Sequence, residues 1–183
     1  MTKRITISSL DAMKASGDKF VMITAYDATF ARLASEAGAE TILVGDSLGM
    51  VLQGHETTIP VSLEAMTYHT ECVARARPHS LIVADLPFMS FSNADDTLHA
   101  STRLMQAGAQ MVKLEGGTWL SDSIHRLVER GVPVCAHLGL TPQSVNVFGG
   151  YRVQGRTPKE AKSILADAVE IQDAGASLLV LEC

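Results

Sequence analysis

The sequence contains few cysteines and no long apolar run, and both absences exclude classes of protein. Cys72, Cys135 and Cys183 are the three cysteines in 183 residues, and no C-x-x-C pair occurs. This spacing argues against a disulfide framework and against a zinc ribbon. No run approaches the roughly 18 apolar residues that a membrane helix needs, and the first twenty residues lack the apolar core of a secretory signal. We therefore expect a cytoplasmic protein.

An excess of positive charge is also lacking. Fifteen Lys and Arg residues stand against twenty Asp and Glu residues, which gives a net charge of −5. We therefore expect neither nucleic acid nor an anionic membrane as a partner. With 46% hydrophobic residues and no low-complexity tract, the chain is predicted to fold as a single domain over residues 1–183.

Six short apolar runs rich in Val, Ile and Leu predict six β-strands. Because their apolar character is nearly continuous, we expect parallel strands that are buried on both faces. The runs are Phe20–Asp27, Thr41–Asp46, Ser80–Pro87, Met111–Gly116, Pro133–Gly139 and Ser177–Cys183.

Amphipathic stretches between these runs predict five helices, over Ala28–Ala37, Leu63–Ala76, Ala94–Ala107, Leu120–Arg130 and Lys159–Ala174. Three of them end in Ala-Gly, at Gly38, Gly108 and Gly175, as expected where a glycine closes a helix in the left-handed conformation. We also expect Ser62 and Thr157 to act as helix N-caps, with Pro158 in the first turn.

Two α/β architectures fit this alternation of strands and helices. A doubly wound sheet usually carries a glycine-rich phosphate turn after its first strand, and no such turn follows the first run here. A (β/α)8 TIM barrel instead gathers functional residues at the carboxyl ends of several strands, which this chain does. A whole barrel takes about 250 residues, so we expect a partial barrel that contains the first six of the eight strands.

Polar residues stand at the ends of five predicted strands. They are Asp46 and Ser47, Asp85, Lys113 and Glu115, His137, and Glu182. By strand alternation, Asp46 shares a face with Val44, Asp85 with Val83, and Glu182 with Val180. We therefore expect these groups to converge above the interior of the barrel.

Several carboxylates buried together require a compensating cation. Lys113 supplies one charge, and the oxygen ligands favour Mg²⁺ over Zn²⁺, with Asp46 and Asp85 as the best pair. The competing interpretation is that each acid is a turn or helix-cap residue. For His137 alone, the alternative is an ordinary core histidine.

One connection is unusually long. Residues Leu140–Arg156 separate the fifth predicted strand from the last helix and contain Gly149, Gly150 and Gly155. A loop of this length is usually functional, often a lid.

Four segments carry a close resemblance to a known family. Val44–Thr70 (VGDSLGMVLQGHETTIPVSLEAMTYHT), Ala84–Ser90 (ADLPFMS), Met111–Gly117 (MVKLEGG) and Cys135–Arg156 (CAHLGLTPQSVNVFGGYRVQGR) resemble the 3-methyl-2-oxobutanoate (ketopantoate) hydroxymethyltransferases. The resemblance spans the whole chain. It implies a TIM barrel, an Mg²⁺ cofactor and a homo-oligomer, a decamer in the family.

The resemblance also implies roles for individual residues. Asp46 and Asp85 would bind Mg²⁺, with Glu115 as a third metal-associated position. Asp46, Ser47, Asp85 and Lys113 would hold the 2-oxo acid, His137 would support it, and Glu182 would act as the proton acceptor. The co-substrate would be 5,10-methylenetetrahydrofolate, and the product 2-dehydropantoate (ketopantoate), in pantothenate biosynthesis.

Two other hypotheses stay open. One is a catalytically inactive fragment of that enzyme, because the family continues with two further β/α units. The other, which fits the long loop less well, is another Mg²⁺-dependent enolate enzyme of the phosphoenolpyruvate mutase and isocitrate lyase type.

Overall fold

The computed structural model describes residues 4–182, and its centre is one sheet of six parallel strands. Each strand pairs with the next along the chain, in the order β1 to β6. The strands are β1 (Met22–Thr24), β2 (Thr41–Val44), β3 (Leu81–Asp85), β4 (Met111–Glu115), β5 (Val134–Gly139) and β6 (Leu178–Glu182). All six predicted strands are therefore confirmed within the described residues, in the order that the first six strands of a (β/α)8 barrel require; Cys183, predicted as the end of the sixth strand, lies outside those residues.

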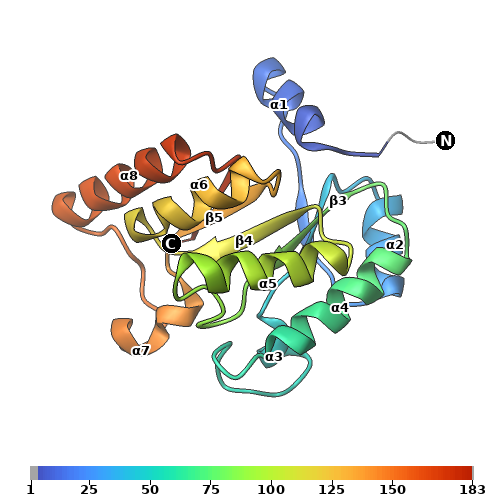
Figure 1. Cartoon of the computed structure of the whole chain (residues 1–183), viewed down its shortest axis with the longest axis horizontal. Helices are drawn as coiled ribbons and strands as arrows, with labels where there is room; N and C mark the ends of the chain where they lie inside the picture. Colours follow the sequence, from blue (N-terminus) through green and yellow to red (C-terminus); the bar gives the residue numbers. More distant parts are fainter. Residues whose placement is uncertain (1–3, 183) are drawn as a thin grey trace.

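Helices connect consecutive strands and cover the outer face of the sheet (Figure 1). The five predicted helices are α2 (Ala28–Glu36), α4 (Leu63–Arg75), α5 (Ala94–Gln106), α6 (Ser121–Glu129) and α8 (Pro158–Asp173). Within the described residues, five elements were not predicted, namely the ten-residue helix α1 (Ile7–Ser16), the short helices α3 (Leu48–Val51) and α7 (Val145–Phe148), and the 3-10 helices η1 (Thr118–Leu120) and η2 (Pro142–Ser144).

The predicted helix caps are present. The Ser62 side chain accepts a hydrogen bond from the backbone N–H of Ala65, and Thr157 forms a reciprocal capping box with Glu160. The glycines of the three Ala-Gly ends, Gly38, Gly108 and Gly175, have positive φ angles between 96° and 113°. These local signals therefore define where the helices begin and end.

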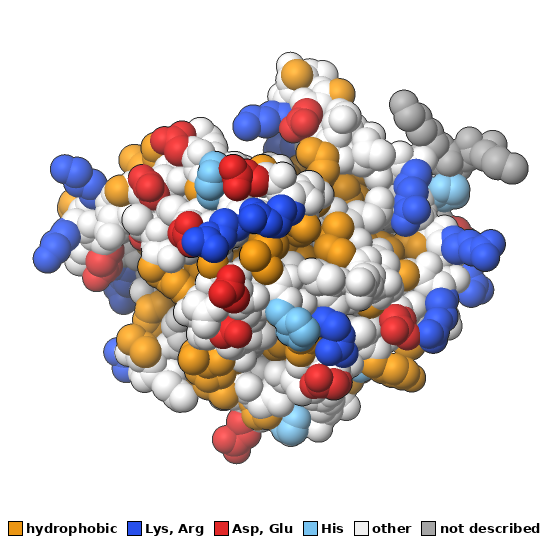
Figure 2. All heavy atoms as spheres, viewed as in Figure 1, with side chains coloured by type: hydrophobic (Ala, Val, Ile, Leu, Met, Phe, Trp, Pro, Cys, Tyr) orange, Lys and Arg blue, Asp and Glu red, His pale blue; other side chains and the backbone are white. Residues whose placement is uncertain are grey.

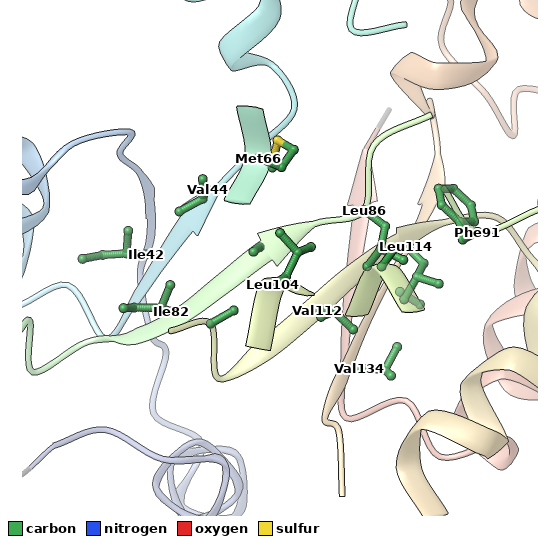
Figure 3. Close-up of a cluster of buried hydrophobic side chains, with 14 of the residues drawn as sticks. Ile42, Val44, Met66, Ile82, Leu86, Phe91, Leu104, Val112, Leu114 and Val134 are labelled. Carbon is green, nitrogen blue, oxygen red and sulfur yellow. The ribbon is translucent and has the colours of Figure 1, made fainter. Parts of the chain in front are cut away.

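The sheet separates two apolar clusters. The larger one lies between the outer face of the sheet and the helices and includes Ile42, Val44, Ile82, Val112 and Leu114 (Figure 3).

The smaller cluster lies on the inner face. There Leu81, Val83, Met111 and Cys135 pack with Leu10 of α1. Helix α1 thus covers the amino-terminal end of the strands, and Figure 1 shows it at the edge of the molecule opposite α3 and α7.

The remaining features concern the surface. Acidic and basic side chains are interspersed on the face shown in Figure 2. Within residues 4–182 no helix combines the length and the apolar character that crossing a membrane requires.

Candidate active site

A buried ion pair forms the centre of the candidate site. Asp85, the last residue of β3, lies beside Lys113 of β4 in the register of the sheet, and Lys113 Nζ is 2.5 Å from Asp85 Oδ1. Both side chains are about 95% buried. The other oxygen of Asp85, Oδ2, accepts a hydrogen bond of 3.1 Å from the backbone N–H of Asp46. The carboxyl ends of β2, β3 and β4 therefore meet at this point, as predicted.

The alternation argument for Asp46 was wrong, although its predicted location was right. Ile42 and Val44 point outward into the helix-covered cluster, whereas Leu43 packs on the inner cluster. A continued strand would therefore have directed Asp46 outward. Strand β2 ends at Val44, however, and a turn begins at Asp46. This turn brings the Asp46 carboxylate inward, where it is buried.

Ser47 follows in the same turn. Its hydroxyl lies 2.8 Å from the hydroxyl of Tyr26, which comes from the segment after β1. Gly45 leaves room for this arrangement, because a Cβ atom at that position would lie 2.9 Å from Ser47 Oγ and would displace that hydroxyl. The Gly-Asp-Ser sequence thus packs the turn closely against β3.

A second group of polar side chains continues around the rim. His137 of β5 is buried, with Nδ1 3.4 Å from Glu115 Oε1 and Nε2 3.4 Å from Glu182 Oε2. Glu182, at the end of β6, is about half exposed. The structure therefore brings all seven predicted site residues to one rim, with His137 between two carboxylates.

Gln143 is a site residue that the sequence analysis missed. Its side-chain amide donates to Asp46 Oδ2 at 2.8 Å and to the carbonyl of Leu86 at 2.9 Å. Its backbone N–H donates to Glu115 Oε2 at 3.0 Å. Gln143 thus joins the start of the long loop to two acids of the site. A single glutamine in a loop belongs to no periodic pattern that would single it out. The only signal was its place within the segment Cys135–Arg156, which carries the family resemblance.

Burial and mutual repulsion dominate the electrostatics of the acids. Burial, then the charges of Asp85 and Glu115, raises the pKa of Asp46 to about 7. Burial also raises the pKa of Asp85, and the nearby Lys113 only partly offsets this effect. Burial alone would lower the pKa of Lys113, but Asp85 and Glu115 outweigh it, and the pKa rises above its usual value. Lys113 therefore stays charged.

The donor set fits Mg²⁺. Three buried acids, Asp46, Asp85 and Glu115, face the single cation of Lys113, so a divalent ion would restore the charge balance. Within residues 4–182, no three or more His, Cys, Asp or Glu side chains are arranged as a ready metal centre. One or two carboxylates with water and substrate suffice for Mg²⁺. The three-residue ligand set stays a prediction.

One acid, Asp27, is a helix-cap residue, which was the competing interpretation for the acids at the strand ends. Asp27, at the end of the first predicted strand, caps α2 by accepting hydrogen bonds from the N–H groups of Thr29 and Phe30. Asp46, Asp85, Glu115 and Glu182 have no such helix-capping role in the structure. The burial of the first three of these acids in one cluster favours a functional interpretation.

Comparison with known sequences identifies close relatives. The sequence profile of a family described as "Ketopantoate hydroxymethyltransferase" matches residues 4–183. Proteins named 3-methyl-2-oxobutanoate hydroxymethyltransferase are 54% identical over 183 residues in Saccharophagus degradans and 60% identical over 178 residues in Burkholderia vietnamiensis. These alignments cover 100% and 97% of this chain, but 68% and 66% of the relatives. The chain thus spans about two thirds of their length.

Solved structures with a similar fold have names that differ from those of the sequence relatives. A phosphonopyruvate hydrolase in complex with oxalate and Mg²⁺ aligns with a TM-score of 0.73 at 16% identity, over 97% of this chain and 63% of that one. A 2,3-dimethylmalate lyase, described as a member of the PEP mutase/isocitrate lyase superfamily, aligns with a TM-score of 0.69 at 17% identity and the same coverage. At such low identity the likeness concerns the fold alone.

Proposed function

Because the chain belongs to the ketopantoate hydroxymethyltransferase family, we propose that it binds 3-methyl-2-oxobutanoate and activates its C3 carbon for hydroxymethylation. The buried Lys113–Asp85 pair is the main support, since it sits beside Asp46 at the strand ends. A charged ammonium group held in this place suits an anionic 2-oxo acid. The phosphoenolpyruvate mutase alternative is not favoured, because the relatives at 54–60% identity have the hydroxymethyltransferase name.

We assign the metal to the acids of this cluster. Asp46 and Asp85 would hold Mg²⁺, with Glu115 behind them. When bound, the ion supplies Lewis-acid stabilisation of negative charge at the keto oxygen of the substrate. Lys113 holds the substrate carboxylate or the same oxygen, and Ser47 offers a hydroxyl to it.

Glu182 is proposed as the general base. It stands half exposed at the rim, where its carboxylate is free to take the C3 proton of the substrate. His137, 3.4 Å away, orients the carboxylate.

The C3 carbanion then attacks the methylene carbon of 5,10-methylenetetrahydrofolate. A C–C bond forms as the first of the two C–N bonds of that carbon breaks. Water then displaces the second nitrogen and supplies the hydroxyl group. The two folate nitrogens take up the proton removed from C3 and one proton of the water, and tetrahydrofolate leaves with 2-dehydropantoate.

The test separates proton removal from the folate step. In D₂O, the chain with Mg²⁺ and 3-methyl-2-oxobutanoate should exchange the C3 proton for deuterium, followed as loss of its NMR signal. We expect Glu182→Gln to slow this exchange by about 100-fold or more. Chelation of the metal should abolish it.

Glu170→Gln is the matched control, because Glu170 is an exposed acid on α8. Its exchange rate should equal that of the unchanged chain. Normal exchange in Glu182→Gln would contradict the assignment of the base.

A second candidate is an inactive fragment of the enzyme. The coverage of the relatives favours it, as do the apolar side chains of Ile23, Leu179 and Leu181, which are 39–66% exposed on β1 and β6. Turnover of this chain should be measured beside that of a chain extended by the remaining third of a relative. Turnover by the extended chain alone would support the fragment hypothesis.

A further inference from the structure

A pocket of about 150 Å³ opens beside the acid cluster. Its walls come from the segment after β3, from the segment after β4 and from η2. The apolar part includes Phe88, Phe91 and Trp119, and the polar part includes Glu115, Gln143 and Ser144. None of these aromatic residues has a part in the chemistry proposed above.

The Trp119 ring is held firmly although its residue is 62% exposed. It stacks on Phe91 with ring centroids 6.0 Å apart and planes 14° from parallel. It also lies against Gly116, where φ is +146° and a Cβ atom would be 2.6 Å from the ring. A large apolar surface fixed in this way is ready to stack on a ligand without losing further conformational entropy.

The neighbouring residue anchors the same turn. Asp167 of α8 accepts hydrogen bonds from the backbone N–H of Thr118 at 2.8 Å and from its hydroxyl at 2.6 Å. The position of Trp119 at the rim is therefore set in part by a contact between its neighbour Thr118 and a different helix.

The inner end of the pocket is polar and adjoins the reaction site. Glu115 presents a buried carboxylate there, which accepts hydrogen bonds from N–H donors. Gln143 lines the pocket and at the same time donates to Asp46. A ligand in the pocket would thus lie one side chain away from the substrate that Asp46 helps to hold.

We propose that this aromatic pocket binds the flat, nitrogen-rich ring of the one-carbon donor. A pterin-like bicyclic ring would stack on Trp119 and donate a hydrogen bond from a ring N–H to Glu115, at the end of the pocket that adjoins Asp46 through Gln143. This assignment rests on the proposed function, which names a folate as the donor.

The single tryptophan makes the assignment testable. Tetrahydrofolate should quench the fluorescence of Trp119 on binding, and calorimetry of the same titration gives the affinity. We expect Trp119→Leu to weaken tetrahydrofolate binding about tenfold, as loss of one stacking partner does. Trp119→Phe keeps an aromatic face and should retain most of the affinity, which distinguishes lost stacking from misfolding.

Phe30→Leu is the matched control, since Phe30 is 63% exposed on α2 and lies outside the pocket. Its affinity should not change. Equal affinities for Trp119→Leu and the unchanged chain, or no binding by the unchanged chain, would overturn the pocket assignment. Fluorescence that changes on dilution without ligand would also overturn it, because the pocket would then be a contact between copies.

These outcomes are independent of the deuterium exchange. If the unchanged chain fails to exchange the C3 proton but binds tetrahydrofolate through Trp119, the proposed function fails and the pocket stands. If exchange occurs and tetrahydrofolate binding does not depend on Trp119, the pocket assignment fails and the proposed function stands.

Discussion

Lys113 is the residue on which the charge balance of the site depends. It is buried among Asp85, Asp46 and Glu115, and its ammonium group contacts Asp85 directly. Burial of a charged pair contributes little net stability compared with an apolar pair, but removal of one partner leaves the other charge uncompensated. Loss of Lys113 should therefore lower the free energy of unfolding mainly because it leaves the buried carboxylate of Asp85 without a counter-charge.

This reasoning gives a prediction for Lys113→Met. In the absence of metal, the free energy of unfolding should fall by about 3–5 kcal/mol, measured by urea denaturation followed by circular dichroism. The double variant Lys113→Met/Asp85→Asn should recover part of the loss, because no unpaired carboxylate remains.

Lys162→Met serves as the control, since Lys162 is exposed on α8. Its stability should change by less than about 0.5 kcal/mol. A Lys113→Met chain as stable as the unchanged one would show that the ammonium group does not compensate Asp85.

At the scale of elements, the junction of β5 and β6 is held by a close backbone approach. Gly139 ends β5 with φ of +85°, opposite Glu182 in the register of the sheet. A Cβ atom at Gly139 would collide with the carbonyl oxygen of Glu182, the same oxygen that accepts a hydrogen bond from Leu140. The glycine thus permits the close approach that places the proposed base.

Gly139→Ala should therefore be worse than an ordinary left-handed glycine substitution. Gly131 is the matched control, because its φ of +79° is similar and no atom lies within 4 Å of an added Cβ. Gly131→Ala should lower the free energy of unfolding by about 1–2 kcal/mol.

Gly139→Ala should lower it further and slow C3 exchange, measured by urea denaturation and by NMR. Equal losses in the two variants would mean that the contact with Glu182 relaxes without cost.

The elements themselves could be predicted largely from the sequence. Apolar runs and amphipathic stretches repeat with regular spacing, and cap residues such as Thr157 mark the helix ends. Helix α1 was missed because its sequence was considered only as a possible signal. Its Leu10 packs on β3, β4 and β5, a contact that no local pattern shows. Helices α3 and α7 have four residues each, too few for a helical period to stand out.

The sequence predicted most residues of the site, but it predicted less well how their side chains reach it. Strand ends indicated Asp85, Lys113 and Glu182, because their faces follow from alternation. Asp46 needed the turn after Val44, and Gln143 needed the path of a loop that returns over the sheet. Both depend on tertiary structure, which a single sequence does not display.

At the scale of the whole molecule, the sheet formed by residues 4–182 is open at its β1 edge and at its β6 edge. Within the part of the chain that the structure describes, β1 and β6 each pair with one strand only. Leu181 of β6 is 66% exposed, and Leu165 of α8, the helix that precedes β6 in the chain, is 65% exposed. Unpaired strands with apolar side chains promote association between chains.

We therefore expect this chain in isolation to self-associate as its concentration rises, measured by sedimentation velocity. Leu181→Lys should shift the distribution toward the monomer, because a charge on an edge strand opposes pairing. Val147→Lys is the control, since Val147 is 87% exposed on α7. An unchanged distribution in Leu181→Lys would exclude β6 as the contact.

The bridge made by Gln143 divides the long loop into two parts with different freedom to move. Residues 140–145 are held by hydrogen bonds to Asp46, Leu86 and Glu115 and by buried side chains at Leu140 and Val145. Residues 149–155 contain three glycines and are mostly exposed. Motion on the nanosecond to microsecond scale is therefore expected in the second part. The part of the loop that faces the acids should therefore stay in place while the second part moves.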